Sequence, residues 1–507
     1  MKRLVLVGLF FIFILGYFLR VMYLPQNSLT FGYDQARDAT IARQILAGDL
    51  KVQGPPASQP GLFHGALYFY VLAVGYLLGN GSPIIAAYWI ALVNMLTVFI
   101  VFYLSYLMTK KYTPSVLAAF LFAISFEATQ YATWLSNPTI AIFTVPLMYL
   151  GLWMWLKQKN TWGVVLAALG LGFSTQAEIF LMYHAVPLAI WLWVGRKNVT
   201  KKNLITFCLV FVASISTMIA NEFLTGFKSI SGLAGLAAGQ EANLAYAKSV
   251  GDYLNLYLNQ IGRIFAFNTY PGNIGYSGGL IVVLVLSGVV YSFKQKDKFT
   301  PELFLATWLF SHLTVVTVGG TSTPFLMVGI GPAVSLVLGI TLYKWFTTGY
   351  KLPAVLVLII LTFGNINTIL KENPRGSTLF SIQKDMLLSK QLAAIDYSYK
   401  KANGEKFTIN TLTSPLWINI VWDYLYKWEG QNKYGYLPQW HGRDQIGQLG
   451  GLPATDKDTK NYFLILEPMG GIPLQYLDLT IGEENTKSRL LEEKSFGELR
   501  IQQRIRI

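Results

Sequence analysis

Long apolar runs separated by short polar connections dominate this sequence. A run of about 18 or more apolar residues can cross the hydrocarbon core of a membrane as a helix. Charged residues make up only 13% of the chain, whereas they form about a quarter of a soluble domain. The sequence therefore predicts an α-helical polytopic membrane protein. The runs lie at 4–23, 83–108, 114–132, 138–156, 161–178, 182–195, 203–222, 276–293, 301–319, 323–345 and 352–370.

The N-terminus has a basic start followed by an apolar stretch, MKRLVLVGLFFIFILGYFLR. Such a segment is either a signal peptide or a first membrane span. It lacks a cleavage site of small residues, which favours an uncleaved span. The single cysteine, Cys208, allows no disulfide within the chain and leaves the redox compartment open.

Basic residues cluster in the short connections on one side of the predicted spans. The positive-inside rule places such clusters in the cytoplasm. They share one side only if a twelfth run, 62–79, is a re-entrant or interfacial element. We therefore expect about 11 transmembrane helices in the plasma membrane, with the N-terminus cytoplasmic and residues 371–507 outside. The clusters are Lys2 and Arg3, Lys110 and Lys111, Lys157 and Lys159, 196–202, 294–298, and Lys344 with Lys351.

The net charge of +14 follows from this anchoring and from attraction to anionic lipid of the inner leaflet. Basic and acidic residues nearly balance in 371–507. We expect membrane lipid, and no nucleic acid, as a partner.

Eight of the ten carboxylates in residues 1–370 fall in predicted outer loops or at the outer ends of spans. Ionisable groups at membrane depth are costly and usually functional. We expect Asp34, Glu127 and Glu178, close to span ends, to line one polar cavity. The alternative is that outer loops are simply solvated, and this reading is preferred for Asp49, Glu241 and Asp252.

The stretch FGYDQARDATIARQILAGDL, residues 31–50, holds three of these acids. Small and apolar positions in 35–47 recur with helical spacing, which predicts an amphipathic helix lying on the membrane surface. Asp34 would then be its N-cap, where a carboxylate accepts backbone N–H groups. On local grounds Asp34 is either a cap or a functional acid.

This stretch resembles the type-C membrane glycosyltransferases (GT-C fold), and within them the bacterial aminoarabinose transferases of lipid A and the protein O-mannosyltransferases. That branch has Asp-Glu-x-Arg-Tyr here, and this chain has Asp34-Gln35-Ala36-Arg37-Asp38. The branch then has a lysine about thirty residues on, where GPPASQPGLFHG places His64. Its later acid corresponds to Asn137. The resemblance covers residues 1 to about 220 and implies a polyprenyl-phosphate sugar donor.

These patterns supply the candidate site. Asp34 is the candidate general base for an acceptor hydroxyl. Arg37 and His64 are the candidate partners of the leaving phosphate, with Arg263 more remote, although Arg37 could instead snorkel to lipid headgroups. For Gln176, Glu178 and His184 the alternative is hydrogen bonding between helices. The full donor- or substrate-binding set is Arg37, Asp38, His64, Glu127, Asn137, Gln176, Glu178 and His184.

No metal-ligand spacing compels a metal site, so no metal ligands are assigned and a divalent metal is left open as the cofactor. The sequence contains no Walker A loop and no HExxH motif. A binding loop for a soluble nucleotide sugar is therefore not visible.

Two outer parts complete the predicted organisation. Residues 1–370 form the membrane domain, with a first outer loop at 24–82 and an outer loop at 223–275 that reads as one or two interfacial helices, acting as a lid. Residues 371–507 form a soluble α/β domain, with strands at 406–414, 461–468 and 498–507 and an aromatic-rich helix at 415–430. The aromatic side chains suit packing better than sugar binding.

The leading hypothesis is an enzyme that transfers a sugar, with inversion, from a polyprenyl-phosphate donor to a glycan, lipid or protein acceptor outside the cytoplasm. One alternative is a transporter or flippase of lipid-linked saccharide, which predicts charged residues at mid-membrane and broken spans. The other is a non-catalytic membrane assembly protein, in which substitution of Asp34 is silent.

Overall fold

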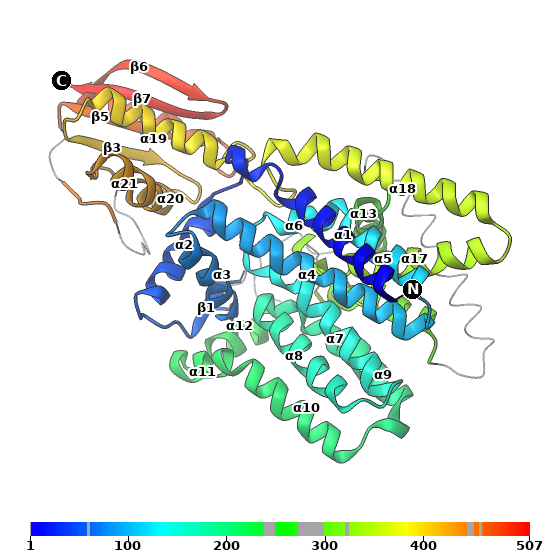
Figure 1. Ribbon diagram of the computed structural model, residues 1–507. Helices are drawn as coiled ribbons and strands as arrows, with labels where there is room; N and C mark the ends of the chain where they lie inside the picture. Colours follow the sequence, from blue (N-terminus) through cyan, green and yellow to red (C-terminus); the bar gives the residue numbers. More distant parts are fainter. Residues whose placement is uncertain are drawn as a thin grey trace.

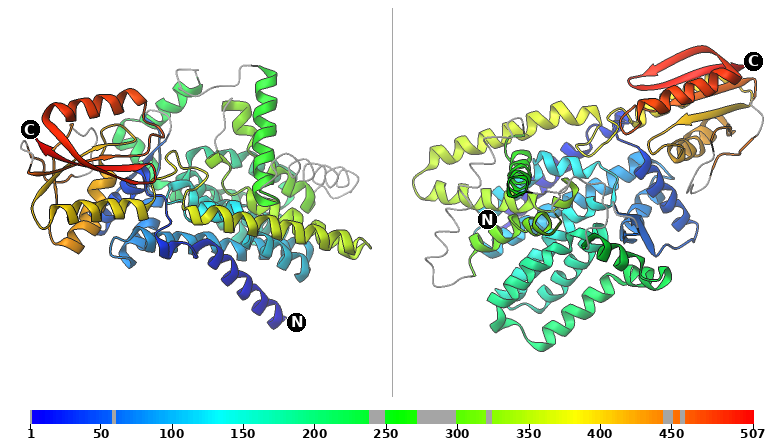
Figure 2. Two further views of the ribbon diagram at one scale, coloured as in Figure 1. Left: turned by 90° about the horizontal axis from the view of Figure 1, so that it is seen from above. Right: turned by 180° about the vertical axis from the view of Figure 1, so that it is seen from behind.

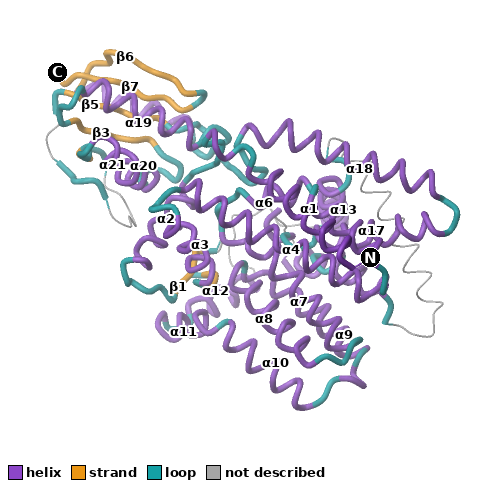
Figure 3. The backbone as a smooth tube through the Cα atoms, in the orientation of Figure 1, coloured by secondary structure: helices purple, strands orange, loops and turns teal. Residues whose placement is uncertain are grey.

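The computed structural model describes residues 2–57, 61–237, 249–271, 299–319, 324–443, 451–455 and 459–507. Helices form residues up to 372 almost entirely, and strands gather near the C-terminus (Figures 1 and 3). The helices of the first part are α1 (Lys2–Val21), α2 (Tyr33–Leu46), α3 (Leu67–Leu78), α4 (Pro83–Thr109), α5 (Tyr112–Ala123), α6 (Phe126–Ala132), α7 (Ala141–Leu156), α8 (Thr161–Ala177), α9 (Ala185–Val194), α10 (Lys201–Ser214), α11 (Ser216–Thr225), α12 (Lys228–Ala237), α13 (Val250–Asn268), α15 (Pro301–Leu309), α16 (Leu313–Gly319), α17 (Gly331–Thr347) and α18 (Lys351–Glu372).

Several of these helices are long and apolar enough to cross a membrane. Within the described ranges four helical stretches meet that criterion, or six if each bent pair of helices is one span. The polytopic helical prediction is therefore confirmed, whereas the count of eleven spans stays a prediction. The predicted span at 276–293 lies outside the described residues. The four stretches are Arg3–Gln26, Pro83–Thr109, Asn137–Leu156 and Lys351–Arg375.

Two of the predicted spans are broken helices. α5 and α6 meet at 55°, and α10 and α11 meet at 58°. Ser125 starts α6 by accepting a hydrogen bond from the amide of Ala128. A break frees backbone groups that must find partners inside a membrane protein. Polar side chains near these breaks can therefore act as hydrogen-bond partners for the freed backbone groups.

Glycines allow α7 and α8 to pack closely. A Cβ on Gly151 would overlap the backbone of Ala167, and one on Gly163 would overlap the backbone of Trp155. Small residues at a helix contact let two backbones approach, which increases van der Waals contact within a membrane. This hairpin holds α8 firmly, and α8 ends next to Glu178.

Residues 24–82, the predicted first outer loop, contain α2, α3 and a two-stranded antiparallel sheet of β1 (Gln53–Pro56) and β2 (Phe63–Gly65). The predicted helix is present, but its N-cap is Gly32 and Asp34 lies in the first turn. The N-cap prediction for Asp34 was wrong because the side chain of Gln35 caps the amide of Gly32 instead, at 3.0 Å. α3 has 12 residues, or about 18 Å, which is too short to cross the roughly 30 Å hydrocarbon core.

The C-terminal region contains a five-stranded sheet of order β4-β3-β5-β7-β6. β4, β3 and β5 are parallel, and β7 and β6 are antiparallel to their neighbours. Helices lie on both faces of the sheet, which buries β3 and β5 almost completely (Figure 2). The elements are α19 (Leu388–Ala402), β3 (Phe407–Leu412), α20 (Ile420–Leu425), α21 (Gln431–Tyr434), β4 (Gln439–Trp440), β5 (Asn461–Leu466), α22 (Leu474–Lys487), β6 (Ser488–Phe496) and β7 (Leu499–Arg506).

The predicted α/β character of this region is confirmed, as are the three predicted strands. The aromatic stretch is helical only from Ile420 onward. Its side chains pack: Trp422 and Tyr424 are buried, and the hydroxyl of Tyr424 donates to the carbonyl of Gly81 at 2.6 Å.

Residues 223–275, predicted as an outer loop, supply α12 and α13, so the predicted helices are present, although 238–248 and 272–275 lie outside the described residues. α13 stands apart from the other helices at its N-terminal end (Figure 2).

Candidate functional site

A cluster of three charged side chains lies on the first two turns of α2. Arg37 Nη1 donates to Asp34 Oδ1 at 2.8 Å. Arg37 Nε donates to Asp38 Oδ1 at 2.8 Å, and Nη2 lies 2.7 Å from the same oxygen. The side chain of Asp34 is 54% exposed, whereas that of Asp38 is 0% exposed. Asp34 is thus the accessible carboxylate of the cluster.

The burial of this cluster corrects two expectations. Arg37 is buried and paired on three nitrogens, so it does not snorkel to headgroups. Asp38 has no exposed oxygen, so it cannot contact a donor directly. Burial raises the pKa of Asp38, and the adjacent Arg37 limits the rise. The helix also packs its polar residues inward, because α2 lies between α3 and α20.

His64, on β2, faces Glu178. The amide of Ile179 donates to His64 Nδ1 at 3.1 Å, so the ring proton of the neutral imidazole lies on Nε2. That nitrogen is 3.6 Å from Glu178 Oε2. Burial, and next the charge of Arg37, lower the pKa of His64 to about 3. His64 is therefore neutral near pH 7 and does not supply the cation expected for a leaving phosphate.

Arg37 lies within electrostatic range of His64. Tyr68, at the start of α3, lies within range of the charges of Asp38 and Arg37. The structure thus brings together Asp34, Arg37, Asp38, His64 and Glu178. Tyr68 also belongs to this cluster and was not predicted from the sequence, because a tyrosine in an apolar helix does not indicate which side chains it will contact.

Gln176 and Asn137 lie close to this site but act on the backbone. Gln176 Nε2 donates to the carbonyl of Ser214 at the break between α10 and α11. Its Oε1 accepts from the amide of Leu67 at 3.1 Å and from Thr217 Oγ1 at 2.9 Å. Asn137 Nδ2 donates to the carbonyl of Ala177 at 2.6 Å. Both side chains hold the turn that carries Glu178, so the helix–helix alternative describes them better than sugar binding.

Glu127 belongs to a different buried cluster. Asn268 Nδ2 donates to Glu127 Oε2 at 2.6 Å, and Ser125 Oγ donates to Asn268 Oδ1 at 2.7 Å. Arg263, on α13, lies within electrostatic range of Glu127 and Tyr131. The contact of α6 with α13 through Asn268 was not visible in the sequence, where Asn268 follows an apolar run.

His184 lies in a third cluster. Its Nδ1 is 2.9 Å from the hydroxyl of Tyr149, and its ring packs at 4.3 Å from the ring of Tyr183. His184 is fully buried, and its neighbour Tyr183 lies within electrostatic range of Glu178.

Of the three acids expected to line one cavity, Asp34 and Glu178 thus lie in one cluster and Glu127 in another. Tyr131 and Tyr183 link the two clusters, because Tyr131 lies within electrostatic range of Glu127 and Tyr183, and Tyr183 lies within range of Glu178.

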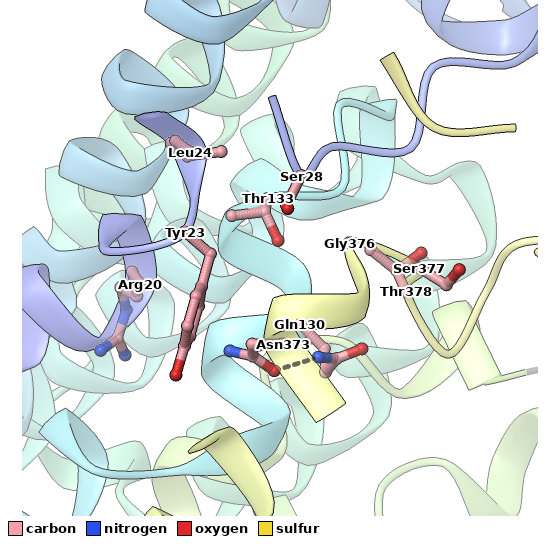
Figure 4. Close-up of a pocket in the computed structure, with 10 residues that line it drawn as sticks. All are labelled: Arg20, Tyr23, Leu24, Ser28, Gln130, Thr133, Asn373, Gly376, Ser377 and Thr378. Atoms are coloured by element: carbon pink, nitrogen blue, oxygen red, sulfur yellow. Dashed lines mark hydrogen bonds between the residues drawn. The ribbon is translucent and has the colours of Figure 1, made fainter. Parts of the chain in front are cut away.

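A small pocket lies where the end of α1, α6 and the end of α18 meet (Figure 4). Its volume of about 10 Å³ suits about one water molecule, so it does not suit a sugar. Arg20, which lines it, donates to Asn94 Oδ1 and to the carbonyls of Gly16 and Ala123 at 2.7–2.8 Å. Gln130 and Asn373 are joined across it by a hydrogen bond of 2.7 Å.

No group of three or more His, Cys, Asp or Glu side chains that could hold a metal ion is present among the residues that the structure describes. His64 and Glu178 face each other as a pair, with Nε2 at 3.6 Å from Oε2.

No protein-family model matches the sequence, and no curated protein matches it. Its structure is similar to that of ArnT from Cupriavidus metallidurans bound to undecaprenyl phosphate, with a TM-score of 0.60 and 11% identity over 99% of this chain and 98% of that chain. The apo state of ArnT gives a TM-score of 0.59 and 12% identity. The chain has a GT-C-like fold.

A third structure, the arabinofuranosyltransferase AftD from Mycobacteria, covers 88% of this chain and 32% of that chain at a TM-score of 0.42. The likeness to ArnT confirms the predicted fold of the membrane helices and their C-terminal region. At 11–12% identity this likeness shows the fold alone. The chemistry depends on the side chains of this protein.

Proposed function

We propose that this protein is a multi-pass membrane glycosyltransferase that moves a sugar from a polyprenyl-phosphate donor to a glycan, lipid or protein acceptor outside the cytoplasm. The observation that carries the proposal is the exposed carboxylate of Asp34, held by a buried arginine at the first turn of α2. The ArnT-like fold supports the donor class, because ArnT binds undecaprenyl phosphate in this fold.

Asp34 acts as general base in a single displacement. It takes the proton of the acceptor hydroxyl as the acceptor oxygen forms a bond to the anomeric carbon. The bond from that carbon to the phosphate oxygen breaks, and polyprenyl phosphate leaves with the electron pair. One displacement inverts the anomeric centre, so the anomeric configuration of the product, measured by NMR, tests this step.

Arg263 is the better candidate for the leaving phosphate, because Arg37 is occupied by two carboxylates and His64 is neutral. Arg263 is partly buried on α13, with its guanidinium over the ring of Phe267 at 5.3 Å. None of its contacts in the described part of the chain is a close ion pair. A partly desolvated guanidinium pairs well with a phosphate.

The membrane domain at 1–370 holds the chemistry in this proposal, and the α/β domain at 371–507 lies outside the cytoplasm. The predicted cytoplasmic N-terminus then places α2 and its acid at the outer face. A donor anchored in lipid and an acceptor from outside would meet there, and such positioning can lower a barrier by roughly 7–11 kcal/mol in well-oriented cases.

The test uses purified protein with a panel of polyprenyl-phosphate sugars, following release of polyprenyl phosphate. We expect release from one donor, lost in Asp34→Asn while donor binding is retained. The matched control is Asp49→Asn in the same outer loop, whose side chain is 61% exposed and pairs with Lys51. The control is expected to keep wild-type turnover.

Two outcomes count against the proposal. Release that is unchanged in Asp34→Asn removes Asp34 as the base. Absence of release from every donor, with a panel of acceptors present and one donor bound, contradicts the transferase and favours movement of the lipid-linked saccharide.

A further inference from the structure

Asp38 is a buried carboxylate that cannot touch substrate. Its side chain is 0% exposed, and Oδ2 has no hydrogen-bond partner among the described residues. A buried charge destabilises a protein unless it is paired and hydrogen-bonded. Asp38 pairs entirely with Arg37. Any effect of Asp38 on the reaction therefore passes mainly through Arg37.

The geometry divides the guanidinium between two acids. Asp38 Oδ1 lies against Nε and Nη2, at 2.8 and 2.7 Å, while Asp34 takes only Nη1, at 2.8 Å. An arginine with a single acidic partner favours a bidentate pair, which is the stronger arrangement. Asp38 occupies the side of the guanidinium that would otherwise be open to Asp34.

This division matters for a general base. A carboxylate that shares an arginine with a second carboxylate makes fewer contacts with it, so more of its lone pairs stay free for the acceptor hydroxyl. A base that is exposed but only partly neutralised is suited to accept a proton from a hydroxyl.

We propose that Asp38 is a positioning residue, which fixes the guanidinium of Arg37 so that Asp34 keeps one contact with it and stays accessible to the acceptor. This inference rests on the proposed function, because it acts through the base of that reaction. Asp38 then acts through Arg37 on Asp34, instead of contacting the donor as expected.

The groups around Asp38 leave Arg37 as its main charged partner. On its own helix the charges are those of Arg37 and Asp34. From α3 the buried phenols of Tyr68 and Tyr76 lie within its electrostatic range. Since a phenol is neutral near pH 7, the balance at Asp34 depends on the two acids and the one arginine.

A double-mutant cycle tests the inference. We expect Asp38→Asn, which keeps the size of the side chain, to lower kcat about tenfold while the donor KM changes less than about twofold. That loss is part of the roughly 100- to 10,000-fold that a general base contributes. In the Arg37→Gln background, Asp38→Asn is expected to have a clearly smaller effect, because the route through Arg37 is gone and only the direct interaction with Asp34 remains.

A purely structural role predicts something else. If Asp38 only supports the packing of α2, Asp38→Asn lowers activity by a similar factor in both backgrounds, and the inference is overturned. The double variant removes both buried charges, so it is expected to fold at least as well as either single variant. Burial raises the pKa of Asp38, so the ratio of wild-type to Asp38→Asn activity is also expected to fall towards one as the pH is lowered.

The same cycle can be run without substrate. A water-soluble carbodiimide with an amine labels protonated carboxyl groups, and mass spectrometry of the peptide that contains Asp34 gives the rate. We expect slower labelling of Asp34 in Asp38→Asn, because Asp34 can then pair with two nitrogens of Arg37 and becomes less accessible, and a smaller difference in the Arg37→Gln background. If labelling of Asp34 depends on Asp38 but no donor is turned over, the proposed transferase is contradicted and this inference stands. If turnover depends on Asp34 but not on Asp38, the transferase stands and this inference is overturned.

Discussion

Glu467 offers a test of how the C-terminal region is held together. It follows β5, is 1% exposed, and accepts hydrogen bonds from the amide of Ser414 at 2.8 Å, Trp422 Nε1 at 3.0 Å and Gln383 Nε2 at 3.3 Å. Gln383 also donates to the carbonyl of Pro468 at 2.6 Å. One buried carboxyl therefore ties the end of β5 to the segment that joins the region to α18.

The perturbation is Glu467→Gln. Burial raises the pKa of Glu467 from 4.5 to about 7, against the opposing effect of its hydrogen bonds. A shift of about 2.5 pH units corresponds to about 3 kcal/mol. The folded protein holds this proton more tightly than the unfolded chain. Stability is therefore fully present below about pH 4.5 and falls by about 3 kcal/mol as the pH rises through 7.

Glutamine removes the pH dependence of stability. Its side-chain NH2 group, however, faces N–H donors of Ser414, Trp422 and Gln383, where the carboxylate accepted hydrogen bonds. Loss of one buried hydrogen bond costs about 1–3 kcal/mol. We therefore expect the variant to be less stable than the wild type at pH 5 and no less stable at pH 8. The free energies of unfolding cross between these values.

Unfolding of the purified protein in detergent, followed at pH 5, 6, 7 and 8, measures the crossing. Hydrogen exchange of the peptide containing β5 locates it, once intrinsic rates are corrected for pH. The control is Asp396→Asn, which removes a partly exposed carboxylate paired with Lys433. A constant difference between wild type and Glu467→Gln across the whole range would refute the reasoning.

Three further changes test the site and its support. Arg263→Gln is expected to lower kcat/KM for the lipid-linked donor by about 10- to 100-fold, since a hydrogen bond to a charged group is worth about 1.5–3 kcal/mol; steady-state kinetics check this. His64→Asn, which keeps an acceptor for the backbone, is expected to leave the shape of the pH–rate profile between pH 5 and 8 unchanged, because the pKa of His64 is about 3. Gly54→Ala would press a Cβ against the carbonyl of Gly65, and we expect a loss of about 1–3 kcal/mol in stability, seen as a lower melting temperature.

The sequence predicted those elements whose residues have a clear propensity for a helix or a strand. β3, β5 and β7 are rich in β-branched, aromatic or alternating residues and were expected. β6, with the sequence SRLLEEKSF, was missed because Glu and Lys are poor strand formers. It is an edge strand whose side chains are largely exposed, and charges at such a position discourage pairing with other chains.

The partners of polar side chains were not predictable in the same way. Asp34 and Arg37 are one helical turn apart, so their pairing follows from spacing alone. His64 instead meets the amide of Ile179, which is 115 residues away. Gln176 meets a carbonyl that is free only because α10 is broken. Such contacts depend on how helices are arranged, and helical periodicity carries no information about that.

The arrangement of the C-terminal region bears directly on the candidate base. Thr30 pairs with Leu387 in an antiparallel bridge, and the amide of Phe31 donates to the carbonyl of Met386 at 3.0 Å. Gln391 Nε2 donates to the carbonyl of Phe31 at 2.6 Å. These contacts fix the residues immediately before Gly32, the N-cap of the helix that carries Asp34. The region after α18 therefore sets the position of that helix, and its integrity matters for the chemistry even when it makes no contact with the acceptor.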